Sequence, residues 1–318
     1  MEKQILALVT GGAGFIGANL CRRLLADGKR VVCIDNFYSS TESNIADLLR
    51  NPDFTFLLHD VMQEFDVPAD EIYHLAAPAS PVHYQKDPVY TLQTIVVGTV
   101  HALQCAQRHG AKLLLSSTSE IYGNPDVHPQ KESYHGNVNP NGPRACYDEG
   151  KRCAETFCSD YRRSRNVDTK IIRIFNTYGP YMHPKDGRVI SEFIIKMLHG
   201  EPVTIHGSGR QTRSFCYIDD LVDGIARMMA SDFAGPVNLG NPYEITVLQL
   251  VEEIARQLGV PVRIRHDEAL VDEPNRRRPD ISMAQELLDW QPHIALSDGI
   301  ARTIDYFRER DDRTDGNI

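Results

Sequence analysis

The sequence lacks the cysteine patterns that cross-link small domains or hold metal ions. Its seven cysteines stand at positions 21, 33, 105, 146, 153, 158 and 216, and no Cys-x-x-Cys motif occurs. A disulfide framework is therefore not expected, and a reducing compartment, the cytoplasm, is favoured. Cys153 and Cys158 lie five residues apart and are interpreted as helix packing, so the sequence predicts no metal site.

Long apolar runs and an excess of positive charge are also missing. The chain has 34 Lys and Arg against 43 Asp and Glu, for a net charge of −9. This balance disfavours sequence-independent binding to nucleic acid or anionic membranes, although it leaves room for a local basic pocket that holds a phosphorylated small molecule. No apolar segment has the length of a membrane helix, and the stretch before the first strand-like run is too short for a signal peptide. The 318 residues suffice for one large domain or two modest ones.

A glycine-rich turn stands between a strand-like run and a helical segment near the start of the chain. Residues 5–9 form a continuous apolar run, typical of a strand buried on both faces, and Gly11, Gly14 and Gly17 follow it. Glycines at this spacing permit a tight turn, close approach to a pyrophosphate and close helix–strand packing. The next apolar run ends at Asp35, where a carboxylate can bond the adenosine ribose. The pattern predicts NAD binding, and Asp35 disfavours NADP because it would repel a 2′-phosphate.

Apolar runs continue to alternate with helical segments, which predicts an α/β fold of Rossmann type, with a doubly wound parallel sheet and a smaller α/β substrate-binding domain. Ligands of such sheets bind at the carboxyl ends of the strands. The predicted domains are 1–176 plus about 214–240 for NAD, and about 177–213 plus 241–310 for the substrate, with a flexible tail at 311–318. The residues expected to contact NAD are Gly11, Gly14, Phe15, Ile16, Gly17, Asp35, Asn36, Asp60, Val61, Leu75, Ala76, Ala77, Thr94, Tyr147 and Lys151. Ordinary turn chemistry remains the alternative for Asp60 and for 75–77.

The stretch from Ser116 to Lys151 carries the candidate chemistry. It follows a buried apolar run, so its hydroxyls and the Glu120 carboxylate emerge where a strand ends. Tyr147 and Lys151 lie four residues apart, one above the other if the segment is helical. A phenol beside an ammonium can act as an oxygen base near neutral pH. A surface contact would explain such a pair standing alone, but the complete cofactor motif favours a catalytic pair.

Three motifs resemble the extended short-chain dehydrogenase/reductase superfamily that acts on nucleotide sugars. They are the glycine turn at 10–17, Thr-Ser-Glu-x-Tyr-Gly at 118–123, and the Tyr147/Lys151 pair. Four further stretches resemble the UDP-glucuronate decarboxylases within it, at 76–81, 139–152, 176–180 with 186–189, and 211–214. The resemblance covers about 5–308. One departure is Ile95, where that family usually has Asn, which puts a local hydrogen bond in doubt.

The resemblance implies that the C4 hydroxyl of UDP-glucuronate is oxidised first. Tyr147 would act as the base, Thr118 would bond O4, and Lys151 would bond the nicotinamide ribose and help lower the pKa of Tyr147. The resulting 4-ketone makes loss of CO₂ easy, and return of the hydride gives UDP-xylose, so NAD acts as a bound catalyst.

For the decarboxylation step, Glu120 is expected near C5 and C6, where two like charges raise at least one pKa. Ser119 would bond the carboxylate or the intermediate. Arg277 would anchor the acid group or the enolate oxygen, with Arg276 or Arg278 as alternatives. A solvated strand-end charge is the plain alternative for Glu120, and a surface basic patch for Arg277.

The resemblance also assigns residues to the UDP-sugar substrate and implies a partner subunit. The nucleotide half is assigned to Asn176, Arg188, Val189, Thr204, His206, Gln211 and Arg213. Arg188 and Arg213 suit the two phosphates, and Tyr84, in the loop after Pro81, would reach the sugar. By analogy with the superfamily, helices at 88–109 and 151–164 would pair two subunits into a homodimer.

Three other functions were weighed against decarboxylation. A UDP-glucuronate or UDP-hexose 4-epimerase shares the Tyr147/Lys151 chemistry but does not need a carboxylate at position 120. A nucleotide-sugar 4,6-dehydratase normally has Asp where this chain has Ser119. A non-catalytic NAD-binding regulator would be expected to have lost Tyr147 or Lys151, and both are present.

Overall fold

A parallel sheet of seven strands forms the larger of two lobes in this computed structural model, which describes residues 3–185, 187–268 and 276–315. The strands lie in the order β11 (Val237–Leu239), β6 (Thr169–Ile174), β5 (Lys112–Thr118), β4 (Glu71–His74), β1 (Leu6–Thr10), β2 (Arg30–Asp35) and β3 (Phe54–Leu58). Every ladder between them is parallel. The predicted Rossmann-type α/β fold is confirmed.

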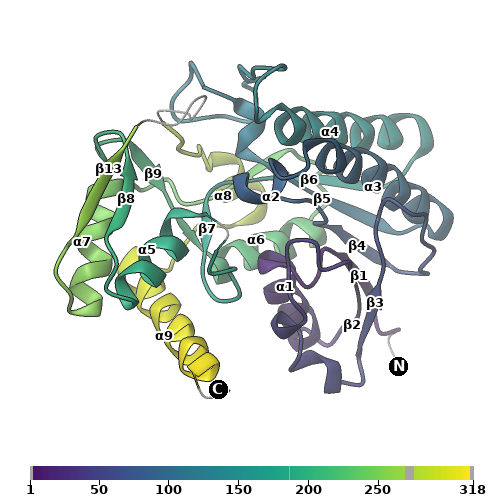
Figure 1. The fold of residues 1–318 in the computed structure, drawn as a ribbon. Helices are drawn as coiled ribbons and strands as arrows, with labels where there is room; N and C mark the ends of the chain where they lie inside the picture. Colours follow the sequence, from purple (N-terminus) through teal and green to yellow (C-terminus); the bar gives the residue numbers. More distant parts are fainter. Residues whose placement is uncertain (1–2, 186, 269–275, 316–318) are drawn as a thin grey trace.

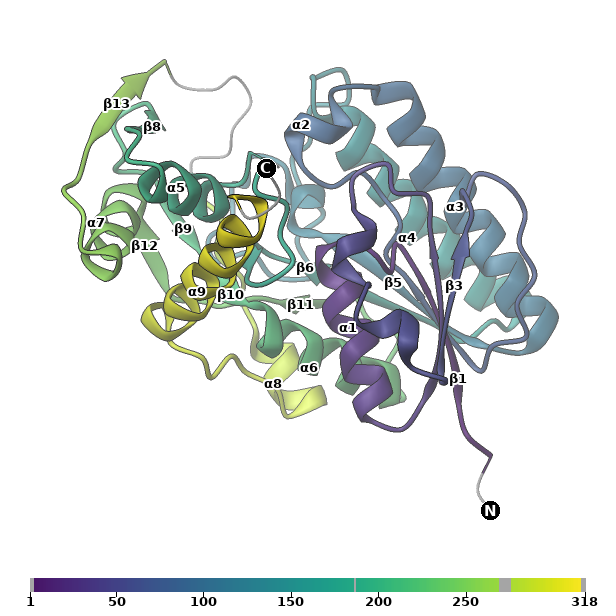
Figure 2. The same ribbon diagram turned by 60° about the horizontal axis from the view of Figure 1, so that its bottom comes forward.

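Helices cover both faces of this sheet, as Figures 1 and 2 show. Helices α3 (Pro88–His109) and α4 (Ala145–Arg165) pack side by side on one face. Helices α1 (Phe15–Ala26) and α6 (Ile218–Ala230) lie on the other. Each face has its own apolar core, because strands such as β4 are buried throughout and present side chains to both layers.

The smaller lobe is built from short strand pairs and three longer helices. Strand β8 (Val203–His206) pairs in parallel with β13 (Ile264–Asp267), and β9 (Thr212–Ser214) pairs antiparallel with β12 (Glu244–Thr246). Helices α5 (Val189–Leu198), α7 (Val247–Leu258) and α9 (Leu296–Asp315) pack around them. The pair β7 (Thr177–Tyr178) and β10 (Cys216–Tyr217) lies between the lobes, and α8 (Ser282–Leu288) packs near β11.

One local expectation, the position of Tyr84, differs from the structure, whereas the flexibility of the tail stays a prediction. The tail expected to be flexible from residue 311 continues α9 as far as Asp315, while 316–318 lie outside the described residues. Tyr84 does not lie in a loop, because Pro81 starts the short helix α2 (Pro81–Tyr84), where a missing N–H costs nothing. In the described part of the chain, no helix has the length and apolar character needed to cross a membrane.

Candidate active site

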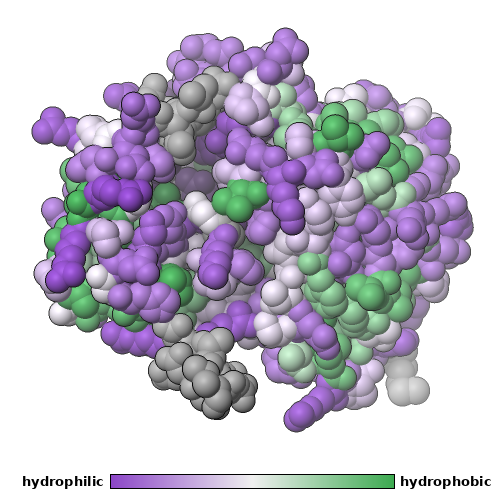
Figure 3. All heavy atoms as spheres, in the orientation of Figure 1, coloured by the Kyte–Doolittle hydropathy of each residue, from purple (hydrophilic) through white to green (hydrophobic). Residues whose placement is uncertain are grey.

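A cavity of about 350 Å³ opens at the carboxyl ends of the sheet strands and reaches between the lobes. Figure 3 shows the molecular surface hollowed there, with mostly hydrophilic residues around the opening. Most of the predicted site residues line it: Gly11, Gly14, Phe15, Ile16, Gly17, Asp35, Asn36, Val61, Leu75, Ala76, Ala77, Tyr84, Thr94, Thr118, Ser119, Glu120, Tyr147, Lys151, Asn176, Arg188, Val189, Arg213 and Arg277. Segments far apart in sequence therefore converge on one volume.

Four predicted residues do not line this cavity. The Asp60 carboxylate accepts hydrogen bonds from Asn36 Nδ2 at 3.0 Å, from the Tyr90 hydroxyl at 2.8 Å and from the Met62 N–H at 2.9 Å, and its contact with adenine stays a prediction beside the turn-chemistry alternative. In the smaller lobe, Gln211 Nε2 donates to the His206 carbonyl at 2.9 Å, and Thr204 is bonded by a lysine of α5. Asp186, part of one resembling stretch, lies outside the described residues.

The glycine turn has the shape that a bound dinucleotide requires. Gly11 has a φ of +70°, and a Cβ there would lie 2.8 Å from the backbone nitrogen of Ala76. A Cβ on Gly17 would lie 2.2 Å from the Gly11 carbonyl oxygen. At the end of β2, the buried Asp35 carboxylate accepts the backbone N–H of Ala13 at 3.0 Å and is held facing the cavity rim. These residues fit NAD, because the backbone leaves room for the pyrophosphate and a carboxylate stands at the ribose position.

Helix α4 carries the Tyr147 and Lys151 pair into the cavity. The Lys151 ammonium donates to the Ser116 carbonyl at 2.7 Å, and burial lowers its pKa to about 8. Burial and the Glu120 charge raise the pKa of Tyr147 to about 12, although a hydrogen bond with Thr118 opposes the rise. The expectation that Lys151, together with the positive charge of the nicotinamide, lowers the pKa of Tyr147 stays a prediction.

Tyr84 packs against the ring of Tyr147 with an interplanar angle of 10° and ring centroids 5.4 Å apart. Its hydroxyl is buried and has no hydrogen-bond partner among the described residues. Because buried hydroxyls are normally paired, this one is suited to bond a ligand in the cavity.

Glu120 lies between two arginine side chains at the start of the short 3₁₀ helix η3 (Ser119–Tyr122), which Thr118 caps by accepting the Glu120 N–H at 3.2 Å. The Glu120 carboxylate pairs with Arg277 and with Arg144, and Arg277 contacts both of its oxygens. Burial alone would raise the pKa of Glu120, but the two guanidinium groups lower it to about 2. The rise expected when a substrate carboxylate lies beside Glu120 stays a prediction, since the lowered pKa describes Glu120 with its two arginines alone.

Sequence reasoning identified Arg277 but missed two neighbours of Glu120. Arg144 lines the cavity, and Asp148 is buried one helical turn further along α4. One oxygen of Asp148 has no hydrogen-bond partner within the described residues, and burial together with Glu120 raises the pKa of this carboxyl to about 7. The sequence does contain a sign of these two residues. Arg144 and Asp148 are four residues apart, a spacing that puts two side chains on one face of a helix, and Tyr147 lies between them in sequence. Arg278, an alternative to Arg277, instead lies 3.9 Å from Glu244.

Comparison with known proteins identifies the family. The profile of the NAD dependent epimerase/dehydratase family matches residues 7–245. UDP-glucuronic acid decarboxylase 1 of Arabidopsis thaliana is 49% identical over 309 residues, which cover 97% of this chain and 71% of that protein. UDP-glucuronic acid decarboxylase 1 of Xenopus tropicalis is 48% identical and covers 95% of this chain and 72% of its own length. The chain belongs to the NAD dependent epimerase/dehydratase family, among its UDP-glucuronic acid decarboxylases.

A solved structure of another family member shows the same arrangement of lobes. UDP-glucuronic acid 4-epimerase from Bacillus cereus, in complex with UDP-glucuronic acid and NAD, superimposes with a TM-score of 0.87. It is 30% identical and covers 96% of this chain and all of its own. The family thus contains decarboxylases and epimerases on one fold, so the side chains in the cavity must separate the two reactions.

The departure from the decarboxylase pattern at Ile95 has a packing explanation. Ile95 is 1% exposed and lies in α3, facing α4. A Cβ on Gly150, the residue before Lys151, would lie 3.2 Å from the Ile95 Cδ1 atom. The isoleucine therefore fills the contact between the two helices with apolar atoms, beside the helix turn that holds the catalytic lysine.

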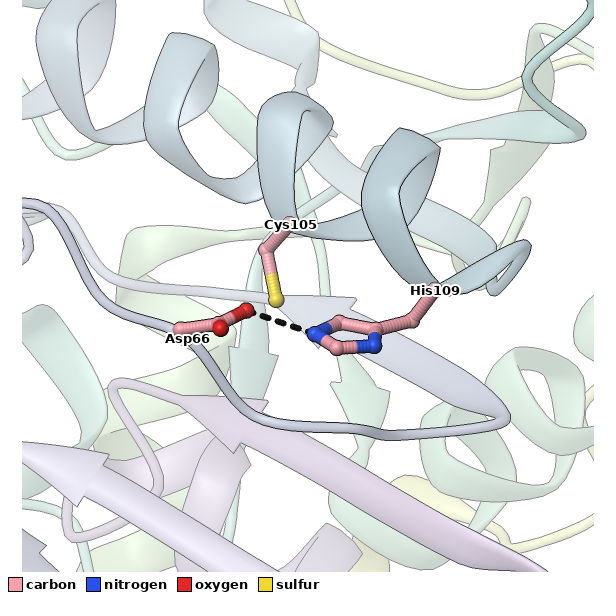
Figure 4. A group of neighbouring side chains, drawn as sticks. All are labelled: Asp66, Cys105 and His109. Carbon is pink, nitrogen blue, oxygen red and sulfur yellow. Dashed lines mark hydrogen bonds and ion pairs between the residues drawn. The ribbon is translucent and has the colours of Figure 1, made fainter.

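A second cluster of polar side chains lies at the far end of α3, away from the cavity. Figure 4 shows Cys105 and His109 projecting from α3 toward Asp66, with their ligand atoms within 4.8 Å of one another. His109 Nε2 lies 2.5 Å from the Asp66 carboxylate, and Arg108 lies 2.9 Å from the same carboxylate. Because this guanidinium already pairs with Asp66, the group forms a partly exposed ion-pair cluster between α3 and the loop that carries Asp66.

Proposed function

We propose that this protein converts UDP-glucuronate into UDP-xylose and CO₂, with NAD held as a catalyst. The observation that carries the proposal is Glu120 between Arg144 and Arg277, in the same cavity as Tyr147. Oxidation of a sugar hydroxyl needs a base such as Tyr147, and a 4-epimerase does not need a carboxylate at position 120, whereas loss of CO₂ calls for further charged groups beside the acid. The sequence identity of 49% to a UDP-glucuronic acid decarboxylase supports the same choice.

The glycine turn and Asp35 would hold the cofactor, and Lys151 stands where the nicotinamide ribose is expected. When bound, NAD supplies reversible removal of a hydride from C4 of the sugar. The positive charge of the oxidised nicotinamide, together with Lys151, would favour the phenolate of Tyr147, whose pKa burial and the Glu120 charge raise to about 12.

Tyr147 removes the proton from the C4 hydroxyl, and Thr118 aligns that oxygen through a hydrogen bond. The product is a ketone at C4, with the carboxylate on the adjacent C5. The bond between C5 and C6 then breaks, its electron pair passes to the C4 oxygen as an enolate, and C6 leaves as CO₂. A proton taken from water would add to C5, Tyr147 would give its proton back to the C4 oxygen, and the hydride restored to C4 would complete UDP-xylose.

Ser119, Glu120 and Arg277 are the groups we assign to the middle step. Ser119 is 2% exposed and lies beside Glu120 in η3, where its hydroxyl is available to the acid group. Arg277 is 7% exposed and holds Glu120 by a fork of two contacts, which makes it suited to stabilise negative charge that develops on oxygen. For the UDP half, we assign Asn176, Arg188, Val189 and Arg213.

Product analysis tests the proposal directly. The purified protein is incubated with UDP-glucuronate as the sole substrate, and sugar products are followed by NMR while CO₂ is trapped. We expect UDP-xylose and one CO₂ per sugar, without net formation of NADH. Stoichiometric UDP-galacturonate without CO₂ would establish the 4-epimerase instead.

We also propose a homodimer in the cytoplasm. The seven cysteines are free thiols, which supports a reducing compartment. Helices α3 and α4 lie side by side on one face of the sheet, and Val89 and Leu92 of α3 are exposed by 65% and 40%. These apolar side chains support pairing through that helical face. Sedimentation equilibrium would give twice the chain mass for a dimer and the single mass for a monomer.

A further inference from the structure

The two guanidinium groups on Glu120 are not held equally. Arg277 approaches both carboxylate oxygens, and the Ser214 hydroxyl donates to its backbone carbonyl at 3.3 Å, which ties the residue to β9. Arg144 contacts only one oxygen of Glu120, through one of its terminal nitrogens. Since a two-point contact fixes a guanidinium more firmly than a one-point contact, Arg144 is the partner that can leave at lower cost.

The backbone of Arg144 is fixed, so only its side chain can move. Its carbonyl accepts the N–H groups of Tyr147 at 3.0 Å and Asp148 at 3.1 Å, in the first turn of α4. The same turn presents the Tyr147 hydroxyl, where the C4 oxygen of the sugar must lie for oxidation. The carboxylate carbon C6 is only two bonds from C4, so the substrate's acid group arrives beside Arg144.

The charges around Glu120 favour the binding of a second carboxylate beside Arg144. Two guanidinium groups share a single carboxylate, that of Glu120, and the three side chains are only 9–18% exposed. A second carboxylate would allow each guanidinium its own partner. The buried Asp148, one turn along α4, also interacts electrostatically with Arg144.

We propose that Arg144 is the residue that selects a uronic acid, by turning from Glu120 to the carboxylate of the bound substrate. Arg277 stays with Glu120 in this exchange. A sugar with a CH₂OH group at C5 is uncharged, so Arg144 remains paired with Glu120 and adds no binding free energy. Once CO₂ has left, the product has no carboxylate, and Arg144 returns to Glu120. The ion pair between Arg144 and the sugar is therefore absent from the product complex, and the affinity for the sugar falls as the reaction is completed.

The inference rests on the proposed function, and the test uses binding so that the two can fail separately. Tyr147→Phe cannot remove the C4 proton, so UDP-glucuronate stays unreacted on the NAD-loaded enzyme. In that background, calorimetry compares UDP-glucuronate with UDP-xylose, which differ by the carboxylate alone. Arg144→Gln should raise the Kd of UDP-glucuronate by about 10- to 100-fold, as for loss of one charge-assisted hydrogen bond, and change that of UDP-xylose less than about threefold.

Arg163→Gln is the matched control, because it removes an exposed arginine from the same helix and should change neither Kd. Equal weakening of both ligands by Arg144→Gln, or no weakening of either, would overturn the proposal. Should Arg144→Gln not fold, a crystal structure of Tyr147→Phe with NAD and UDP-glucuronate decides. It should place the Arg144 guanidinium on the sugar carboxylate, and a guanidinium still on Glu120 would refute the exchange. Absence of CO₂ from the unmodified enzyme would refute the proposed function only.

Discussion

The aromatic rings of Tyr84 and Tyr147 stack with an interplanar angle of only 10°, both residues line the cavity, and the Tyr84 hydroxyl has no hydrogen-bond partner among the described residues. We expect Tyr84→Phe to weaken binding of UDP-glucuronate about 2- to 10-fold, because a ligand hydrogen bond is lost. Thermal stability should not fall, since the hydroxyl makes no hydrogen bond among the described residues. Calorimetry and melting curves check both expectations, and a lower melting temperature with unchanged affinity would contradict them.

Lys151 should make the stability of the protein depend on pH in the alkaline range. Its pKa is lowered from 10.5 to about 8 by burial, so between these values the unfolded chain binds more protons and stability rises with pH. At pH 7 the buried ammonium costs on the order of 3 kcal/mol. Lys151→Met should therefore be inactive yet more stable at pH 7, with a gap that closes as pH rises from 8 to 10.5. Urea unfolding at pH 7 and pH 10 measures the gap, and a variant less stable at pH 7 would refute this reasoning.

Glu120 should contribute stability with the opposite dependence on pH. Although burial opposes it, the guanidinium groups of Arg277 and Arg144 lower the pKa of Glu120 from 4.5 to about 2. The stabilisation is therefore fully present above pH 4.5 and is lost as pH falls toward 2. Glu120→Gln should cost about 3–5 kcal/mol at pH 7, because it leaves two buried cations without their partner. Unfolding curves from pH 7 to pH 4 should show a constant deficit above 4.5 that narrows below it, and a deficit that widens in acid would contradict the ion-pair explanation.

Gly11 and Gly28 form a natural pair for testing the cofactor turn. Both have positive φ, +70° and +77°, but a Cβ on Gly11 would collide with the Ala76 backbone, whereas a Cβ on Gly28 has nothing within 4 Å. Alanine at either position should cost about 1–2 kcal/mol for the left-handed conformation. Gly11→Ala should cost more than Gly28→Ala and should also abolish NAD binding. Equal stability losses and unchanged NAD affinity in the two variants would show that close approach at Gly11 is unimportant.

The fold and the cofactor turn could be predicted because their signals are local. Apolar runs mark buried strands, and the three glycines stand in a row that one turn can use. The charge cluster around Glu120 is different, because its contacts span 24 residues to Arg144 and 157 residues to Arg277. Only the folded chain brings these groups together, so the direction of the Glu120 pKa shift could not be read from the sequence.

The same limit explains the residues assigned to the nucleotide in the smaller lobe. Arg188 and Arg213 line the cavity, but Thr204 and His206, on β8 between them in sequence, do not. In short strands and loops with few periodic features, the sequence does not predict which way each side chain points. In the larger lobe, by contrast, strand ends and helix starts point in known directions.

Strand β11 completes the edge of the main sheet beside β6, although some 60 residues of the chain, including much of the smaller lobe, lie between them in sequence. The chain must therefore be synthesised past Leu239 and leave the ribosome before β11 can pair with β6. Until then β6, whose side chains are almost entirely buried in the finished protein, has no neighbour on that side. Newly made chains consequently have a period in which the apolar edge of β6 is open to pairing with other chains.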